Sequence, residues 1–246
     1  MNEQTPMTLV KWSWLGAVRR CAPWAVGLGI AMCWDRAVYL YVRVGGDAAT
    51  AEAAAMAVEA MERKGWYKFL WVIGTVWPWL IVAAALVFAD FGSDAEKSKR
   101  GLRRAVFLVL GVALSGAAAE IAKLVFRRLR PDQTDGWYQF RPWSEELWSA
   151  TNLGLPSSHA AVAFGAAFSL CWIWPRAAAV FLAAGVGCSL SRLLAGAHFL
   201  SDVLVGTALA FFVVLGVYAL DRRNNGGRGI EADVAASRSK QLDSGG

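Results

Sequence analysis

The chain has 246 residues, of which 57% are apolar or aromatic and 18% are charged, with a formal net charge of +6. An ordinary soluble domain carries about 25% charged residues, whereas here the charges gather in short clusters between long uncharged runs. This balance excludes intrinsic disorder, collagen and a coiled coil. The sequence has no stripe of basic residues on a polar fold, so its positive net charge does not indicate nucleic-acid binding. The sequence is typical of a membrane protein.

Six segments are apolar enough to form spans, so we expect an all-α, polytopic membrane helix bundle with six transmembrane helices. A span needs about 20 mostly apolar residues to cross a hydrocarbon core about 30 Å thick. The first segment contains Asp35 and Arg36, which we expect to make a local polar contact, and no cleavage site follows it, so it is predicted to be a retained span. The six segments are residues 22–43, 69–89, 105–126, 158–175, 177–195 and 203–220.

The remaining segments are predicted to lie outside the membrane. Residues 48–64 are rich in Ala and end in charged residues, which favours a surface helix. Residues 1–21 are predicted to be a cytoplasmic N-terminal segment and residues 22–220 a single six-span domain. Residues 221–246 are rich in Asn, Gly and Ser, so we expect a disordered cytoplasmic tail.

The Lys and Arg residues predict the orientation, because cytoplasmic loops of membrane proteins are enriched in them. Six spans place both termini on one side, together with the loops near residues 90–104 and 176. That side carries Lys11, Arg19, Arg20, Lys97, Lys99, Arg100, Arg103, Arg104, Arg176, Arg222, Arg223, Arg228, Arg238 and Lys240, of 25 basic residues in all. We therefore expect an inner-membrane protein with cytoplasmic termini.

Three polar clusters lie at span ends that this topology brings to the outer face. Polar residues at membrane depth are costly, so each is a functional candidate. Both histidines of the chain fall in these clusters. The clusters are Lys123, Arg130 and Pro131; Pro156, Ser157, Ser158 and His159; and Ser191, Arg192, His198 and Asp202.

This combination of residue types suits the transfer of a phosphoryl group. Lys123, Arg130 and Arg192 supply three cations, and the start of a helix at residue 158 supplies free N–H groups for a dianionic phosphate. Histidine is a natural nucleophile and proton donor near neutral pH. His198 and Asp202 are four residues apart, which predicts one helical face and a carboxylate that fixes the imidazole tautomer. No residues have metal-ligand spacing, so we expect neither metal nor cofactor.

Simpler roles are open for several neighbours. Arg127 and Arg128 are expected to be anchors that extend to the membrane interface. Glu120 can neutralise Lys123 one turn away or contribute to the site, and the structural role is favoured. Ser157 alone would be an ordinary helix N-cap.

The three motifs resemble the signature of the type 2 phosphatidic acid phosphatase family. They read K-x6-R-P from Lys123, P-S-x-H from Pro156, and S-R-x5-H-x3-D from Ser191 to Asp202. The resemblance covers residues 123–202, and the one departure is Ser158, where the family usually has Gly. It implies a membrane phosphatase rather than one of the soluble haloperoxidases of the family.

The resemblance also implies a role for each residue. His198 would be the nucleophile that forms a phosphohistidine, Asp202 would orient it, and His159 would protonate the leaving oxygen. The phosphoryl oxygens would be held by Lys123, Arg130, Ser157, Ser158 and Arg192. The expected substrate is a lipid phosphomonoester or pyrophosphate at the outer face.

Two functional alternatives stay open. The substrate can be undecaprenyl diphosphate specifically, or another of several lipid phosphates, because the motifs recognise only the phosphate. The second alternative belongs to a different functional class: a transporter that binds an anion or lipid in the same basic cavity. The loop between residues 131 and 155, with Trp137 and Trp143 among its aromatics, is either a passive interfacial belt or a lip that admits the lipid.

Overall fold

The computed structural model describes residues 14–46, 48, 50–92 and 95–230, and within them the regular elements are helices. The eight α-helices are α1 (Trp14–Val42), α2 (Ala51–Glu62), α3 (Gly65–Ile73), α4 (Trp77–Ala89), α5 (Ala95–Phe126), α6 (Ser158–Ile173), α7 (Ala178–Leu194) and α8 (Leu200–Asn224). Two short 3-10 helices are η1 (Pro131–Gln133) and η2 (Pro175–Ala177). The prediction of an all-α bundle is confirmed.

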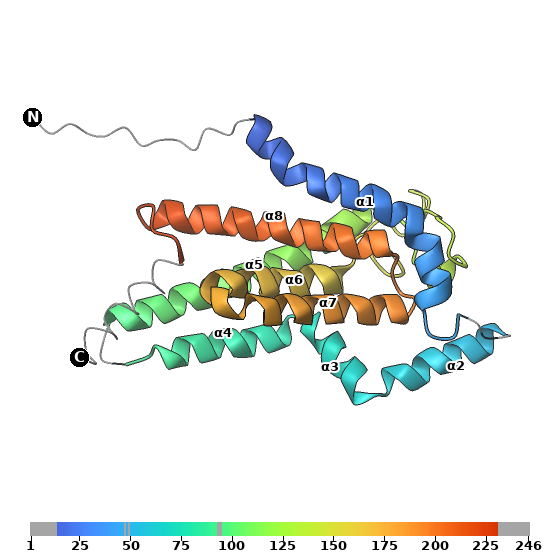
Figure 1. Cartoon of the computed structure of the whole chain (residues 1–246), viewed down its shortest axis with the longest axis horizontal. Coiled ribbons are helices and arrows are strands. Elements are labelled where there is room, and N and C mark those ends of the chain that lie inside the picture. The colour runs from blue at the N-terminus through green and yellow to red at the C-terminus, as the bar shows by residue number, and fades with distance from the viewer. Residues whose placement is uncertain (1–13, 47, 49, 93–94, 231–246) are drawn as a thin grey trace, which may run out of the picture.

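Helix α6 is the centre of the bundle and packs against α5, α7 and α8 (Figure 1). It is apolar on all sides and largely buried, as expected of a central helix. Small residues allow the neighbouring helices to pack closely against α6. A Cβ atom at Gly165 would lie 2.7 Å from the carbonyl oxygen of Gly111 on α5, and one at Gly206 on α8 would lie 2.5 Å from that of Ser157. The backbones at both contacts therefore need glycine.

Among the described residues, four helices are long and apolar enough to cross a membrane. They lie at residues 19–42, 95–126, 175–194 and 200–224, and α3 with α4 makes a fifth if the bent pair is one span. Helix α6 is apolar but has only 16 residues. The chain is thus a multi-pass membrane protein with four or five candidate spans by these criteria, fewer than the six that the sequence predicts.

The predicted continuous span at residues 69–89 is broken. Helices α3 and α4 meet at an angle of 67°. Pro78 lies in the first turn of α4 and has no N–H to donate to the preceding turn, and its ring clashes with a continuing helix. Gly74 occupies the bend, where it lies directly against His159. The local sequence therefore ends one helix and starts another.

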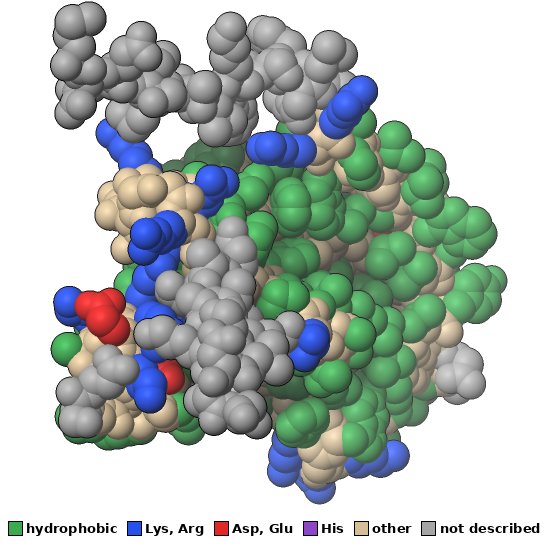
Figure 2. Space-filling model, turned by 60° about the vertical axis from the view of Figure 1, so that its left-hand side comes forward, with side chains coloured by type: hydrophobic (Ala, Val, Ile, Leu, Met, Phe, Trp, Pro, Cys, Tyr) green, Lys and Arg blue, Asp and Glu red, His purple; other side chains and the backbone are tan. Residues whose placement is uncertain are grey.

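The bundle has two chemically different ends. The right-hand end in Figure 1 carries the connections from α5 to α6 and from α7 to α8. In Figure 2, which brings the left-hand side of Figure 1 forward, several groups of Lys and Arg side chains are visible. Helix α2 lies beside the right-hand end, so the predicted helix between the first two spans is present.

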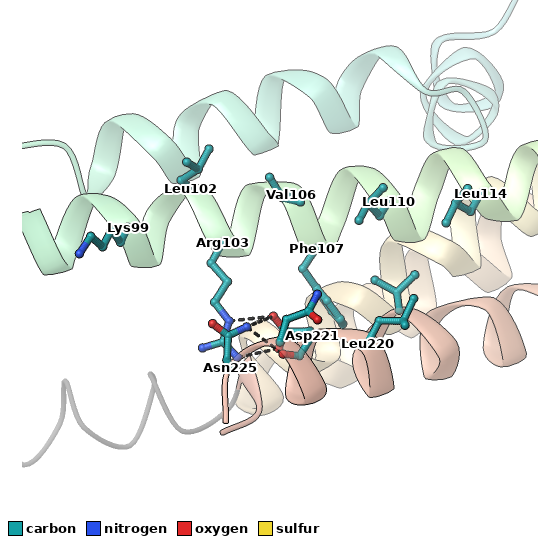
Figure 3. A pocket seen from close by; sticks show the side chains of 12 residues that line it. Lys99, Leu102, Arg103, Val106, Phe107, Leu110, Leu114, Leu220, Asp221 and Asn225 are labelled. Atoms are coloured by element: carbon teal, nitrogen blue, oxygen red, sulfur yellow. Dashed lines mark hydrogen bonds and ion pairs between the residues drawn. The ribbon is translucent and has the colours of Figure 1, made fainter. Parts of the chain in front are cut away.

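The start of the predicted C-terminal tail is folded in the structure. Helix α8 continues to Asn224, and Arg103 on α5 forms an ion pair with Asp221 at 2.6 Å. This pair closes one end of a cavity of about 400 Å³ between α5 and α8 (Figure 3). The side chain of Ile230 is fully buried. Helix α8 thus continues into the segment predicted as a tail, while residues 1–13 and 231–246 lie outside the described residues.

Candidate active site

The three polar clusters predicted from the sequence meet at the right-hand end of the bundle in Figure 1. Each is placed by the end of a helix. Lys123 lies in the last turn of α5 and Arg192 in the last turn of α7, whereas Ser158 and His159 open α6. Because α6 and α8 run antiparallel to the helices before them, starts and ends of helices meet here. The positive charges of Arg192, Lys123 and Arg130 all act on the His159 ring.

Ser157 ties the start of α6 to α8. Its Oγ accepts a hydrogen bond from the N–H of Ala160, and its own N–H donates to the carbonyl oxygen of Asp202 at 2.9 Å. The serine is therefore an N-cap, as the simpler interpretation predicts. Its hydroxyl hydrogen is a separate donor that can also serve a ligand.

Several buried nitrogen atoms in the described part of the chain lack a hydrogen-bond partner, among them Nη1 of Arg127, Nε of Arg128 and three that belong to predicted site residues. These three are Nε of Arg130, Nε of Arg192 and Nε2 of His159. A buried donor without an acceptor costs free energy comparable to a lost hydrogen bond. An oxyanion would satisfy the two guanidinium groups, since arginine pairs well with phosphate oxygens. The site is built to receive an acceptor-rich group.

Two of the cationic side chains also have hydrogen-bond partners within the protein. Lys123 Nζ donates to Glu120 Oε1 at 2.9 Å, and Arg192 Nη1 donates to the Tyr67 hydroxyl at 2.7 Å. Glu120 therefore neutralises Lys123 as expected. The same Glu120 oxygen also accepts a hydrogen bond from the Ser158 hydroxyl, which the sequence does not predict.

The His198 ring lies against both a backbone carbonyl and the carboxylate of Asp202. It precedes α8, whose N-cap is Phe199, so His198 lies just outside the helix and not on one helical face with Asp202, although the expected contact between the two side chains is present. Its Nδ1 atom lies 3.0 Å from the carbonyl oxygen of Gly154 and 3.6 Å from Asp202 Oδ2. A carbonyl only accepts, so Nδ1 carries the proton and Nε2 has a free lone pair. This tautomer leaves Nε2 with the lone pair that an attack on phosphorus requires.

Burial lowers the pKa of His198 to about 4, because the charged ring would lose its hydration. Asp202 raises this pKa, whereas the positive charges of Arg192 and Arg130 lower it further. The net direction is downward, so the ring is neutral at physiological pH. This outcome agrees with the requirement for a neutral nucleophile.

The carboxylate of Asp202 is paired with Arg128, a residue whose role the sequence analysis missed. Both side chains are buried, and Arg128 Nη2 donates to Asp202 Oδ1 and, at 2.7 Å, to Ser201 Oγ. Oδ2 of Asp202 accepts from the N–H of Phe199 at 2.8 Å. Asp202 therefore anchors the start of α8. The signal in the sequence is charge balance: a buried carboxylate at a span end requires a nearby cation.

Arg127 is also buried, so the expectation that Arg127 and Arg128 are interfacial anchors is wrong for both. The backbone of Arg127 is left-handed, with φ of 56°, and turns the chain inward after α5. Its guanidinium donates to the carbonyl oxygens of Arg141, Pro142 and Glu145. Three satisfied carbonyl groups compensate for the buried charge. Arg127 thus holds the loop that carries the aromatic residues.

The aromatic loop lies over this end of the bundle. Isolated β-bridges pair Arg128 with Phe140 and Leu129 with Leu153, which fixes the two ends of the loop beside the site. The side chains of Trp137 and Trp143 are 57% and 63% exposed. These rings are available to lipid or substrate.

The described residues contain no group of three His, Cys, Asp or Glu side chains that could hold a metal ion. The cationic residues around His159 would instead repel a metal. The donor set of this site fits an anion.

Comparisons with known proteins agree with the motifs. Residues 104–225 match the profile described as the PAP2 superfamily. The chain is similar to a "Lipid A 1-phosphatase" of Rhizobium etli, with 32% identity over 143 residues, and to one of Rhizobium johnstonii, with 33% over 151 residues. The alignments cover 53% and 56% of this chain and 60% of each relative, so the chain matches about three fifths of their length. No solved structure matches.

Proposed function

We propose that this chain, which belongs to the PAP2 superfamily, hydrolyses a phosphomonoester or pyrophosphate of a membrane lipid through a phosphohistidine intermediate. The observation that carries the proposal is the set of unpartnered nitrogen atoms of Arg130, Arg192 and His159 beside a His198 whose Nε2 is unprotonated. A phosphoryl group supplies the acceptors that these donors lack and the electrophile that the nucleophile needs.

In the first step, Nε2 of His198 attacks phosphorus and the bond from phosphorus to the lipid oxygen breaks. Protonated His159 donates its proton to that oxygen, so a lipid phosphomonoester leaves as an alcohol and a lipid pyrophosphate leaves as the lipid monophosphate. Lys123, Arg130 and Arg192 stabilise the negative charge of the phosphoryl oxygens, and electrostatic stabilisation of this kind dominates phosphoryl transfer. The Ser157 hydroxyl donates to the same oxygens, and the Ser158 hydroxyl does so when it turns away from Glu120.

In the second step, His159 accepts a proton from water, and the resulting hydroxide character drives attack on the phosphohistidine. The bond from Nε2 to phosphorus breaks, inorganic phosphate leaves and His198 returns to its neutral form. The Gly154 carbonyl holds the His198 ring throughout, because Nδ1 remains its donor. Every charge that develops is met by protein side chains, so the reaction needs no metal.

The first substrate class to test is a glycolipid phosphate such as the 1-phosphate of lipid A. The similarity to two relatives that bear the name of this activity supports the choice. Undecaprenyl diphosphate remains the alternative substrate.

We also propose that the chain crosses the inner membrane six times, with the site at the non-cytoplasmic face. A 16-residue helix such as α6 is about 24 Å long at 1.5 Å per residue, which is enough for a central span surrounded by longer helices. The Lys and Arg residues in the first turns of α5 lie at the end of the bundle away from the site, which supports cytoplasmic termini.

The test is phosphate release by the purified protein in detergent with EDTA present. We expect release from at least one member of a panel containing lipid A, undecaprenyl diphosphate, phosphatidylglycerophosphate and phosphatidic acid, and none from His198→Ala. A protein that only transports an anion would bind these lipids without turnover. Release that strictly requires a divalent metal would overturn the metal-free mechanism.

A further inference from the structure

Helix α8 begins immediately after His198, but its own N-cap residue cannot cap it. The first N–H groups of a helix have no partner inside the helix, and Ser, Thr, Asp or Asn at the N-cap normally accepts from one of them. Phe199 holds the N-cap position and has no acceptor in its side chain. Of the backbone N–H groups at the start of the helix, Asp202 accepts from that of Phe199. The N–H of Ser201, the second residue of the helix, needs a partner from elsewhere.

That partner is Asp35, a residue of α1. Its Oδ1 accepts from the N–H of Ser201 at 2.8 Å, and its Oδ2 accepts from the hydroxyl groups of Ser201 and, at 2.5 Å, Tyr138. Asp35 is only 1% exposed. A negative charge at a helix N-terminus is also stabilised by the helix dipole. The carboxylate therefore does for α8 what an N-cap side chain would do.

The same contacts connect Asp35 to the parts of the site that contain His198 and Asp202. The Ser201 hydroxyl donates to Asp35 and accepts from Arg128, which in turn pairs with Asp202. His198 is joined to the helix start through Phe199. If the first turn of α8 shifts, both the His198 ring and Asp202 shift with it. Asp35 lies outside residues 104–225, which match the family profile, so this support comes from a separate part of the chain.

We propose that Asp35 caps α8 from α1 and is thereby a positioning residue for His198. This inference rests on the proposed function where it concerns turnover, but the cap itself does not. Asp35 contacts Ser201 and Tyr138 rather than the cationic residues, so it acts on the nucleophile and not on phosphate binding. Its removal lowers kcat and leaves KM close to that of the wild type.

The experiment compares Asp35→Ala, Asp35→Asn and Asp221→Ala in the full chain. Asparagine keeps an oxygen that can accept from the Ser201 N–H. Asp221→Ala removes a largely buried carboxylate from the other end of the same helix, where it pairs with Arg103, and serves as the matched control. Three quantities are measured: amide hydrogen exchange at residues 199–204, the rate of His198 modification by diethyl pyrocarbonate, and kcat and KM per folded molecule.

We expect Asp35→Ala to speed exchange at the start of α8, to speed His198 modification and to lower kcat about 10- to 100-fold, since a displacement near 1 Å can cost that much. Asp35→Asn stays near the wild type in all three, and Asp221→Ala leaves the start of α8 unchanged. Unchanged exchange in Asp35→Ala would overturn the cap. Faster exchange with an unchanged kcat would overturn the positioning role.

A wild-type protein that releases no phosphate from any lipid would refute the proposed function and not this inference. Exchange and His198 modification then decide, because neither requires a lipid substrate. Faster exchange together with faster modification supports the positioning role. An unchanged modification rate overturns it.

Discussion

The guanidinium of Arg128 forms an ion pair with the carboxylate of Asp202 in which the side chains are 3% and 0% exposed. Removing one member of a buried pair leaves an uncompensated charge, which costs about 3–5 kcal/mol. We therefore expect Arg128→Met to lower the thermal unfolding temperature in detergent strongly and to abolish turnover. Arg128→Lys should recover only part of the unfolding temperature and part of the turnover, since one ammonium group replaces a guanidinium that donates to two partners.

The control is Arg63→Met. Arg63 pairs with Glu59 on the surface, where both side chains are mostly exposed, and such pairs contribute little. An Arg128→Met protein as stable as Arg63→Met would contradict the importance assigned to the buried pair.

The pH dependence should reflect the lowered pKa of His198. Burial disfavours the protonated ring and lowers its pKa to about 4. The nucleophile must be neutral, so kcat/KM should rise with pH through about 4. A profile of kcat/KM with an acid limb centred near 6.5, the ordinary histidine value, would contradict the buried environment.

Gly74 is expected to be essential because it lies against His159. A Cβ atom at this position would be 2.6 Å from Cδ2 of His159 and 2.8 Å from Sγ of Cys188. Gly74→Ala should therefore displace the His159 ring and lower kcat on the order of 10-fold or more. Gly65→Ala is the matched control, since a Cβ atom there meets nothing within 4 Å. Equal activity of the two variants would show that the ring tolerates the displacement.

The exposed tryptophans of the loop should affect lipids selectively. If Trp137 and Trp143 form a lip for the lipid, replacing both with Ala should reduce turnover of a long-chain lipid phosphate much more than that of a soluble short-chain one. Lys123→Ala should reduce both, because it acts on the phosphate. Equal losses from the Trp changes would indicate destabilisation of the loop, in which Trp143 stacks on Arg127.

The sequence predicts the helices and the convergence of the motifs well, because both depend on local pattern and on alternating helix direction. Residues 203–220 carry no charge, and the structure has α8 there. The bend at Gly74 was missed, since an apolar run of ordinary length hides a break that Pro78 and a neighbouring ring impose.

The partners of the buried charges could not be predicted, because they are set by tertiary contacts. Spacing predicts that Asp202 lies beside His198, and the two side chains are 3.6 Å apart, but spacing does not predict that Asp202 also pairs with Arg128 or that the Gly154 carbonyl contacts His198. Asp35 was expected to make a local polar contact in the bundle. Its partner Ser201 lies 166 residues later in the chain, and no periodicity of the sequence predicts a contact between segments so far apart.

The most direct test of the central claim is to trap the phosphorylated enzyme. The purified protein is mixed with a lipid phosphate labelled with ³²P and quenched in alkali, in which phosphohistidine survives, and the labelled peptide is identified by mass spectrometry. We predict label on His198 in the wild type and none in His198→Ala. Phosphate release without a labelled histidine, or with label on Ser157 or Ser158, would contradict the account.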